Sequence, residues 1–514
     1  MGSDLIRVTG LNSGLDTESI ISAYTSKYQK KIDNAKKEIE LGKVRTEAWK
    51  NLNSKIYSFY SNTLSTNRLS TAYQKKKTTT SNTMLSVVAG ENAVEGVQTA
   101  KIISSAKAAY LTGGKTQLTS GADNLSEKLG IAEGEQITFT ANDGTTQTFQ
   151  IGGTAADDSI KVVNTMNDLV SGLKNAGVNA NFDEANQRLF ISAKSTGASS
   201  DFTITGSSLE TLDKLGLASK EDLANAGMST NNAMAKIDGS NAKLVLNGAE
   251  FESDTNSFKI NGSTYTINGV PADPTEEISV STGIDYDGVY DVVKSMLKEY
   301  NELVNEMSKL YNAADASSYN PLTSEQKAEM TDQEIEDWDN KIKESILRKD
   351  ATIYDVLNTL TGTMSEGISV NGKKMYLSDF GISTLGYFSA EENERYALHI
   401  DGDKDDSATS GNTDKLKSMI ASDPSAVTSF FSQMAGNLYK NLYAKMGSTS
   451  MSSIYKVYND KQMESDAKSW EKKLAEYEIE LSDAEDRYYK KFSAMETALA
   501  KINSKQSSLS GLFS

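Results

Sequence analysis

Both ends of the chain carry apolar side chains at alternating steps of three and four residues, and this pattern limits the possible folds more than any other feature. Asp16 and Thr17 offer capping oxygens just before the N-terminal series. Such spacing predicts long helices that pair along a coiled-coil seam. The candidate partner-contact residues of this seam are Ile21, Tyr24, Tyr28, Trp470, Leu474, Tyr477, Leu481, Tyr488, Met495 and Ile502.

Charge is distributed unevenly along the 514 residues, whose net charge is −17. Residues 1–77 carry 14 basic and 7 acidic side chains, and residues 451–514 carry 10 basic and 11 acidic ones. The net charge of the middle, residues 78–450, is therefore −23. The basic residues near the start lie within a helical pattern and form no compact patch, which argues against nucleic-acid binding. Nine acids between 464 and 486 predict that helices of opposite sign at the two ends can pair.

The middle of the chain has a different pattern. Short alternating runs bounded by Gly, Asn, Asp and Ser fill residues 78–285, including QITFTANDGTTQTFQIGG and RLFISAKSTG. These are signals of strands and hairpins. One helix is expected at about 157–176, ended by Gly177. Helix returns at 286–312 and at 422–446, where Ser422 or Asp423 can cap and Pro424 suits the first turn.

This order predicts an α+β multidomain fold, in which helical coiled-coil termini and a helical leg domain enclose two inserted β-rich head domains. The predicted boundaries are 1–45 and 451–514 for the coiled-coil segments, 46–77 with 286–450 for the leg, 78–106 with 231–285 for one head domain, and 107–230 for the second head domain with its one helix.

Few residues could support catalysis or metal binding. Cysteine is absent, which excludes disulfides and thiolate sites, and His399 is the only histidine. His399 lies in an alternating run, which predicts a structural residue on a strand. The acidic run 401–407 lacks the glycine and glutamate of a calcium loop, since Asn412 stands at the twelfth place counted from Asp401. We therefore expect no enzyme, no cofactor and no metal. No apolar run approaches the ~18 residues of a membrane span, so no membrane insertion is expected.

The opening segment TGLNSGLDTESIISA, residues 9–23, resembles the N-terminal signature of the flagellar cap protein family, also called hook-associated protein 2. Stretches 297–307, 376–388 and 423–439 are similar to the family's C-terminal region, 177–197 to repeats in several hook-associated proteins, and 320–350 to an insertion in caps from some Gram-positive bacteria. The signature residues are Gly10, Leu11, Ser13, Gly14, Leu15, Asp16 and Thr17.

The resemblance implies a bacterial flagellum protein, exported by the flagellar type III apparatus without a cleaved signal peptide and secreted to the filament tip. There a homo-oligomeric ring, a pentamer in the family, would prevent leakage of flagellin and promote its folding and polymerisation. It implies flagellin, hook-associated junction proteins and an export chaperone as partners. A hook–filament junction protein remains the alternative, and the β-rich head leaves a second role as an adhesin open.

Overall fold

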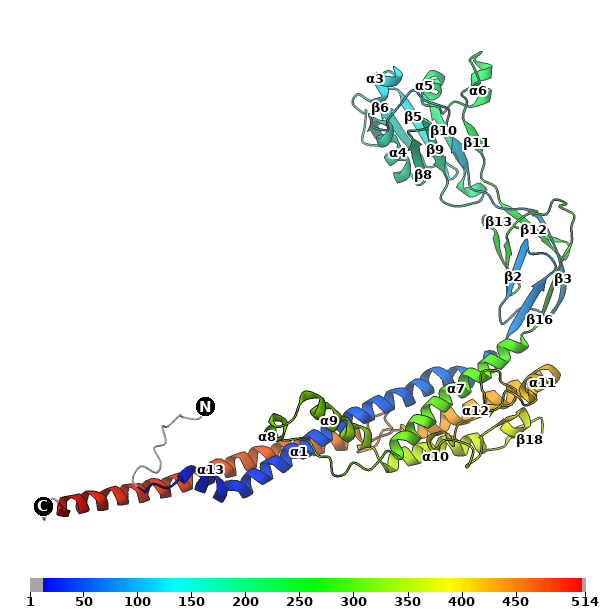
Figure 1. Ribbon diagram of the computed structural model, residues 1–514. Coiled ribbons are helices and arrows are strands. Elements are labelled where there is room, and N and C mark those ends of the chain that lie inside the picture. The colour runs from blue at the N-terminus through cyan, green and yellow to red at the C-terminus, as the bar shows by residue number, and fades with distance from the viewer. Residues whose placement is uncertain (1–12, 511–514) are drawn as a thin grey trace. The chain divides into compact units, whose positions relative to one another are not determined.

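The computed structural model describes residues 13–510, which divide into two compact units. The helical unit contains the chain up to Gln74 and from Tyr286 onward, and the β unit contains Lys75–Asp285. Figure 1 shows helices in the first and strands of several sheets in the second. The α+β multidomain fold predicted from the sequence, with helical ends around an inserted β-rich middle, is confirmed.

Long helices dominate the helical unit. Its elements before the β unit are α1 (Thr17–Ser58), the π-helix η1 (Phe59–Leu64), α2 (Ser65–Asn67) and the 3-10 turn η2 (Ser70–Tyr73). Those after it are α7 (Tyr286–Tyr311), α8 (Ser324–Ala328), α9 (Asp332–Ser345), α10 (Ala351–Ser365), β17 (Ile368–Val370), β18 (Lys373–Met375), η4 (Leu377–Phe380), β19 (Ile382–Ser383), η5 (Glu392–Glu394), β20 (His399–Ile400), α11 (Lys415–Ser422), α12 (Pro424–Lys445) and α13 (Asp460–Ser510).

The apolar face of α12 lies in the core of the helical unit. Asp423 caps this helix by accepting a 3.0 Å hydrogen bond from the Ala426 N–H, and Pro424 occupies the first turn, as the sequence predicts. The apolar stripe of Val427, Phe430, Met434 and Leu438 is buried. It packs on α10 and on the π-helix, so the leg helices and the end of α1 share one core.

The β unit contains short strands and four short helices. Its strands are β1 (Lys76–Thr80), β2 (Leu85–Ala89), β3 (Gly96–Ser104), β4 (Tyr110–Thr112), β5 (Gln136–Ala141), β6 (Thr146–Ile151), β7 (Ile160–Val163), β8 (Asn179–Asp183), β9 (Arg188–Ser192), β10 (Phe202–Gly206), β11 (Ala235–Ile237), β12 (Ala242–Leu246), β13 (Ala249–Ser253), β14 (Ser257–Ile260), β15 (Ser263–Ile267) and β16 (Ile278–Ile284). Its helices are α3 (Leu125–Leu129), α4 (Met166–Asn175), α5 (Leu209–Lys214) and α6 (Lys220–Asn225).

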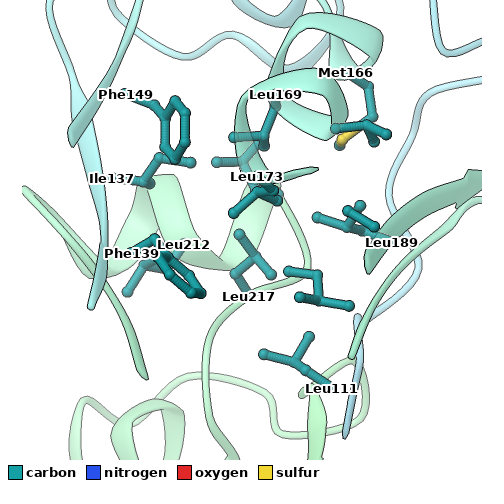
Figure 2. Close-up of a cluster of buried hydrophobic side chains, with 14 of the residues drawn as sticks. Leu111, Ile137, Phe139, Phe149, Met166, Leu169, Leu173, Leu189, Leu212 and Leu217 are labelled. Carbon is teal, nitrogen blue, oxygen red and sulfur yellow. The ribbon is translucent and has the colours of Figure 1, made fainter. Parts of the chain in front are cut away.

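Two hydrophobic cores form inside the β unit. One joins the five-stranded sheet β1-β16-β3-β12-β13 to the sheet β14-β15-β2. The other lies between the sheets β10-β5-β6-β7 and β11-β4-β9-β8 and includes α4. Figure 2 shows side chains of this second core gathered around Leu173 and Leu217. The alternating apolar pattern of the sequence therefore supplies inward-facing residues to two separate cores.

The helix expected at about 157–176 is wrong in its first half. Ile160–Val163 form β7, which pairs in parallel with β6, and α4 begins only at Met166. Thr165 caps α4 in a reciprocal capping box with Asp168. The expectation of one helix in 107–230 is also wrong, because the structure has α3, α5 and α6 as well. These three helices have five or six residues each, too few for a clear helical period.

Candidate functional site: the paired terminal helices

The opening motif forms the start of α1. Asp16 caps the helix, accepting hydrogen bonds from the Ser19 N–H at 3.1 Å and the Ser19 hydroxyl at 2.6 Å. The hydroxyl bond from Ser19 lowers the pKa of Asp16. Gly14 precedes this cap with a φ of 72°, a conformation that side chains with a Cβ rarely adopt. Thus Ser13, Gly14, Leu15, Asp16 and Thr17 form a turn and a cap, whereas Gly10 and Leu11 lie outside the described residues.

The two terminal helices lie side by side and run antiparallel (Figure 1). Tyr24 stacks on Tyr488 with ring centroids 5.2 Å apart, and Lys31 pairs with Glu480 at 2.8 Å. Closer to the leg, Trp49 stacks on Tyr458 at 5.4 Å, although Tyr458 lies just before α13. Residue numbers rise along α1 while those of the residues it contacts fall, from Tyr488 to Tyr458, as expected for an antiparallel pair. The pairing inferred from opposite charge is therefore present in the structure.

Besides its ion pair with Glu480, Lys31 contacts two aromatic rings of the seam. Its ammonium lies 5.7 Å from the Tyr28 ring centroid and 5.0 Å from that of Tyr477. The hydrogen bond to Glu480 raises the pKa of Lys31. Because both charged side chains are nearly half exposed, this contact specifies helix register more than it adds stability.

The other predicted seam residues differ in burial. Ile21 is buried, and Leu481 lines the groove between the helices together with Ile21 and Thr25. Tyr24 and Ile502 are exposed, at 56% and 57%. Those that are half-buried are Tyr28, Trp470, Leu474, Tyr477, Leu481, Tyr488 and Met495. The predicted seam residues are thus mostly only partly buried between the two helices. Their role in contacting a partner stays a prediction.

His399 lies on β20, as the alternating sequence pattern predicts. Its Nδ1 is 2.6 Å from the Asp406 carboxylate. Burial raises the pKa of Asp406, but the contact with His399 and the hydrogen bonds from the Ala408 N–H and Thr409 together lower it below its ordinary value. Lys294 bridges Asp403 and Asp405 at 2.6 Å each, so one ammonium group offsets part of the negative charge of the acidic loop. Within residues 13–510, no group of three or more histidine or acidic side chains has the arrangement of a metal site. No helix in the same range has the length and hydropathy to cross a bilayer.

Sequence reasoning missed a group of five tyrosines in the helical unit, here named the tyrosine cluster: Tyr57, Tyr60, Tyr439, Tyr443 and Tyr455. Tyr60 of the π-helix stacks on Tyr439 with ring centroids 4.2 Å apart. The spacing of Tyr57 from Tyr60 and of Tyr439 from Tyr443 places each pair on one helix face, and this was the available signal.

Two family models match the chain. Residues 239–504 match the family model described as flagellar hook-associated protein 2 C-terminus, and residues 13–109 match the N-terminus model of the same family. The chain belongs to the flagellar hook-associated protein 2 family. The N-terminal match begins at Ser13 of the opening motif and continues through α1 into the first strands of the β unit.

Individual members of this family are distant from the chain in sequence. Flagellar hook-associated protein 2 of Halalkalibacterium halodurans is 25% identical over 281 residues, which are 51% of each chain. The protein of that name from Thermotoga maritima is 24% identical, over 70% of this chain and 54% of its own. An A-type flagellar hook-associated protein 2 of Pseudomonas aeruginosa is 27% identical, over 59% of this chain and 63% of its own. The chain thus spans between half and two thirds of these relatives.

Solved structures include the D1-D2-D3 domains of the flagellar cap protein FliD from Escherichia coli. That structure matches with a TM-score of 0.47 and 17% identity, over 82% of this chain and 99% of its own. FliD (HAP2) from Pseudomonas aeruginosa PAO1 matches with a TM-score of 0.33 and 20% identity, over 46% and 100%.

Proposed function

We propose that this protein caps the distal end of the bacterial flagellar filament as a ring of identical chains. Its family membership supports this role, and so do the solved relatives named flagellar cap proteins. The ring would retain exported flagellin at the tip and promote its folding and polymerisation. This is an assembly role performed by surfaces, in keeping with a chain that has no cysteine and one histidine.

The observation that carries the proposal is the paired terminal helices. Side chains on α13 after Met495 are mostly exposed, and Ile502 is 57% exposed although it follows the apolar spacing of the seam. An amphipathic helix whose apolar positions face solvent is suited to bind a further helix. We infer that this stretch contacts the filament end, where flagellin subunits and the hook-associated junction proteins are the available partners.

We assign the predicted regions to parts of this cap. Residues 1–45 and 451–514 form the docking stalk, and 46–77 with 286–450 form the leg. Residues 78–106 with 231–285, and residues 107–230, form two head domains. The head carries most of the negative charge, which would disfavour nonspecific binding at the exposed tip. Export through the flagellar type III apparatus, with a chaperone before export, completes the proposal.

A deletion strain tests this function. Electron microscopy should show hooks without filaments, and the culture supernatant should contain monomeric flagellin. Expression of the wild-type chain should restore filaments. Hooks that release their junction proteins would instead favour a hook–filament junction protein. Normal filaments in the deletion strain would contradict the cap, and a loss of surface attachment with normal filaments would indicate an adhesin.

A further inference from the structure

We propose that two exposed aromatic surfaces on opposite sides of the helical unit bind each other between neighbouring copies of the chain. One surface is the loop of residues 384–398, here named the aromatic loop, and the other is the tyrosine cluster. The contact rests on the proposed ring and names the residues that would close it. Because two different surfaces meet, the contact is heterologous, and repeated copies can form a ring.

The aromatic loop presents two rings to solvent. Phe388 is 99% exposed and Tyr387 is 64% exposed, with ring centroids 5.4 Å apart in an edge-on arrangement. The Arg395 guanidinium lies 3.9 Å from the Tyr387 ring centroid and orients it. An exposed Phe beside an exposed Tyr forms a contiguous apolar patch, the kind of surface that marks an interaction site. Aromatic anchors that are ordered before binding lose little entropy on association.

The tyrosine cluster offers a larger surface of matching chemistry. Tyr443 is 47% exposed, Tyr455 39% and Tyr57 38%, and the neighbouring loop adds Ile454 at 50% and Met451 at 49%. Tyr and Met are enriched in protein–protein interfaces, where aromatic residues supply much of the binding energy. Inserting Phe388 among these rings would remove the most exposed apolar side chain of the helical unit from water.

Charge favours the same pairing. The aromatic loop carries Glu391, Glu392 and Glu394 against Arg395. At the tyrosine cluster, the Arg68 guanidinium is 4.4 Å from the Tyr439 ring centroid, and Lys440 and Lys456 directly follow Tyr439 and Tyr455 in the sequence. Within residues 13–510, none of these three cations makes an ion pair. The acidic loop of one copy would therefore face the basic residues beside the tyrosine cluster of another copy. An acidic partner would instead be repelled by the loop, so charge favours a second copy of this chain.

The contacts of α7 place the two surfaces on opposite sides of the helical unit. Helix α7 faces α1 and the π-helix through Glu306, which binds Lys55 at 2.7 Å, and through Glu299, which accepts from Thr63. Asn301 is two residues after Glu299, about 200° around the helix, and it bonds both backbone groups of Leu398 at 2.8 Å. The aromatic loop therefore ends, at Leu398, on the side of α7 that faces away from α1.

The tyrosine cluster lies on the far side of α1. Tyr57 follows Lys55 by two residues, which turns it about 200° away from α7. Its ring centroid is 5.4 Å from that of Tyr455, so the cluster extends from this far face. Since the two surfaces point away from each other, one chain cannot join them, whereas contact between two copies buries both.

Cross-linking between copies tests the contact directly, because the chain has no native cysteine. Purified full-length Phe388→Cys and Tyr443→Cys chains are each treated with a short bismaleimide, alone and mixed. We expect a covalent dimer only in the mixture. Ser369→Cys, on the separate β17 strand, is the control thiol and should form none with Phe388→Cys. Equal cross-linking of Phe388→Cys with itself or with the control, or no cross-link in the mixture, overturns the contact.

Assembly of the full chain provides the second measurement. Light scattering should show that Tyr387→Ala with Phe388→Ala raises the midpoint concentration of assembly at least about tenfold, the effect of losing one interface anchor. Changing Glu391, Glu392 and Glu394 to Lys should weaken assembly, and Arg68→Glu with Lys440→Glu in the second chain should restore it. A wild-type chain that stays monomeric at every attainable concentration overturns the contact, as does a double variant that assembles like wild type.

Complementation separates this contact from the cap function itself. If the double variant assembles normally and restores filaments as the wild-type chain does, the contact is wrong and the cap stands. If the wild-type chain fails to restore filaments to the deletion strain, the proposed function is wrong. Capture of purified flagellin by wild type but not by the double variant, with assembly unchanged, would reassign the aromatic loop to flagellin and overturn the contact.

Discussion

Two helix-interior glycines show how the surroundings of a residue decide the effect of one methyl group. A Cβ at Gly172 in α4 would lie 2.3 Å from Cε1 of the buried Phe149, whereas a Cβ at Gly42 in α1 would meet nothing within 4 Å. Gly172→Ala should destabilise the protein by about 1–3 kcal/mol through overpacking. Gly42→Ala should stabilise it by about 0.5–1 kcal/mol. Chemical denaturation followed by circular dichroism measures both, and equal effects of the two substitutions would contradict the packing argument.

The capping box of α4 gives a residue-scale pH dependence. Burial raises the pKa of Asp168, but hydrogen bonds from Thr165 and the Asn164 N–H outweigh it and hold the pKa below its ordinary value. The stabilising effect is therefore complete above the pKa of about 3.9 of an unfolded aspartate and is lost as pH falls through the lower folded value. Thr165→Ala should cost about 1 kcal/mol at neutral pH. Thermal melts from pH 7 to pH 3 should show this difference shrinking, and a difference independent of pH would contradict the assignment.

At the scale of elements, the sequence predicts long structures better than short ones. Helices α7 and α12 follow an apolar period over several turns, and both lie where the sequence places them. Residues 157–176 mix two periods, because β7 uses Ile160 and Val163 in a sheet before the Thr165 cap starts α4. The tyrosine cluster was not predictable as a site. It combines residues of α1, the π-helix, α12 and the loop before α13, which only the tertiary fold brings together.

One buried side chain ties the loop before α13 to α1. Asn53 is 3% exposed, its Nδ2 donates to the Tyr455 carbonyl at 3.2 Å, and its Oδ1 accepts from the Val457 N–H at 3.0 Å. Asn53→Ala leaves both backbone groups without these partners and should cost about 1–3 kcal/mol. Hydrogen exchange should accelerate at Val457 and its neighbours. Ser54→Ala, at the exposed next position, is the control, and unchanged exchange in Asn53→Ala would show that the loop is held by its aromatic contacts alone.

At the scale of the whole molecule, we expect the paired terminal helices and the β unit to unfold independently. The β unit has cores of its own that include no residue of α1 or α13. Leu474→Asp with Leu481→Asp should therefore open the seam while the β unit stays folded. Each Leu contributes up to about 1.5–3 kcal/mol when fully buried, and the new carboxylates lie near Glu476, Glu478 and Glu480 on the same helix. If the chain is exported as proposed, secretion of this variant should persist.

Filament growth is the decisive measurement for this double variant. If the paired terminal helices dock the cap, filaments should be lost and monomeric flagellin should accumulate in the supernatant, with the β unit still folded by circular dichroism. Ile479→Asp is the matched control, because Ile479 lies on the same helix between the two leucines and is 63% exposed. It adds one negative charge, against two in the double variant, on the exposed face of α13 without opening the seam, so filaments should form normally. Loss of filaments in both variants would mean that charge on α13 is itself harmful. Normal filaments in the double variant would move the docking role from the terminal helices to the leg or the head.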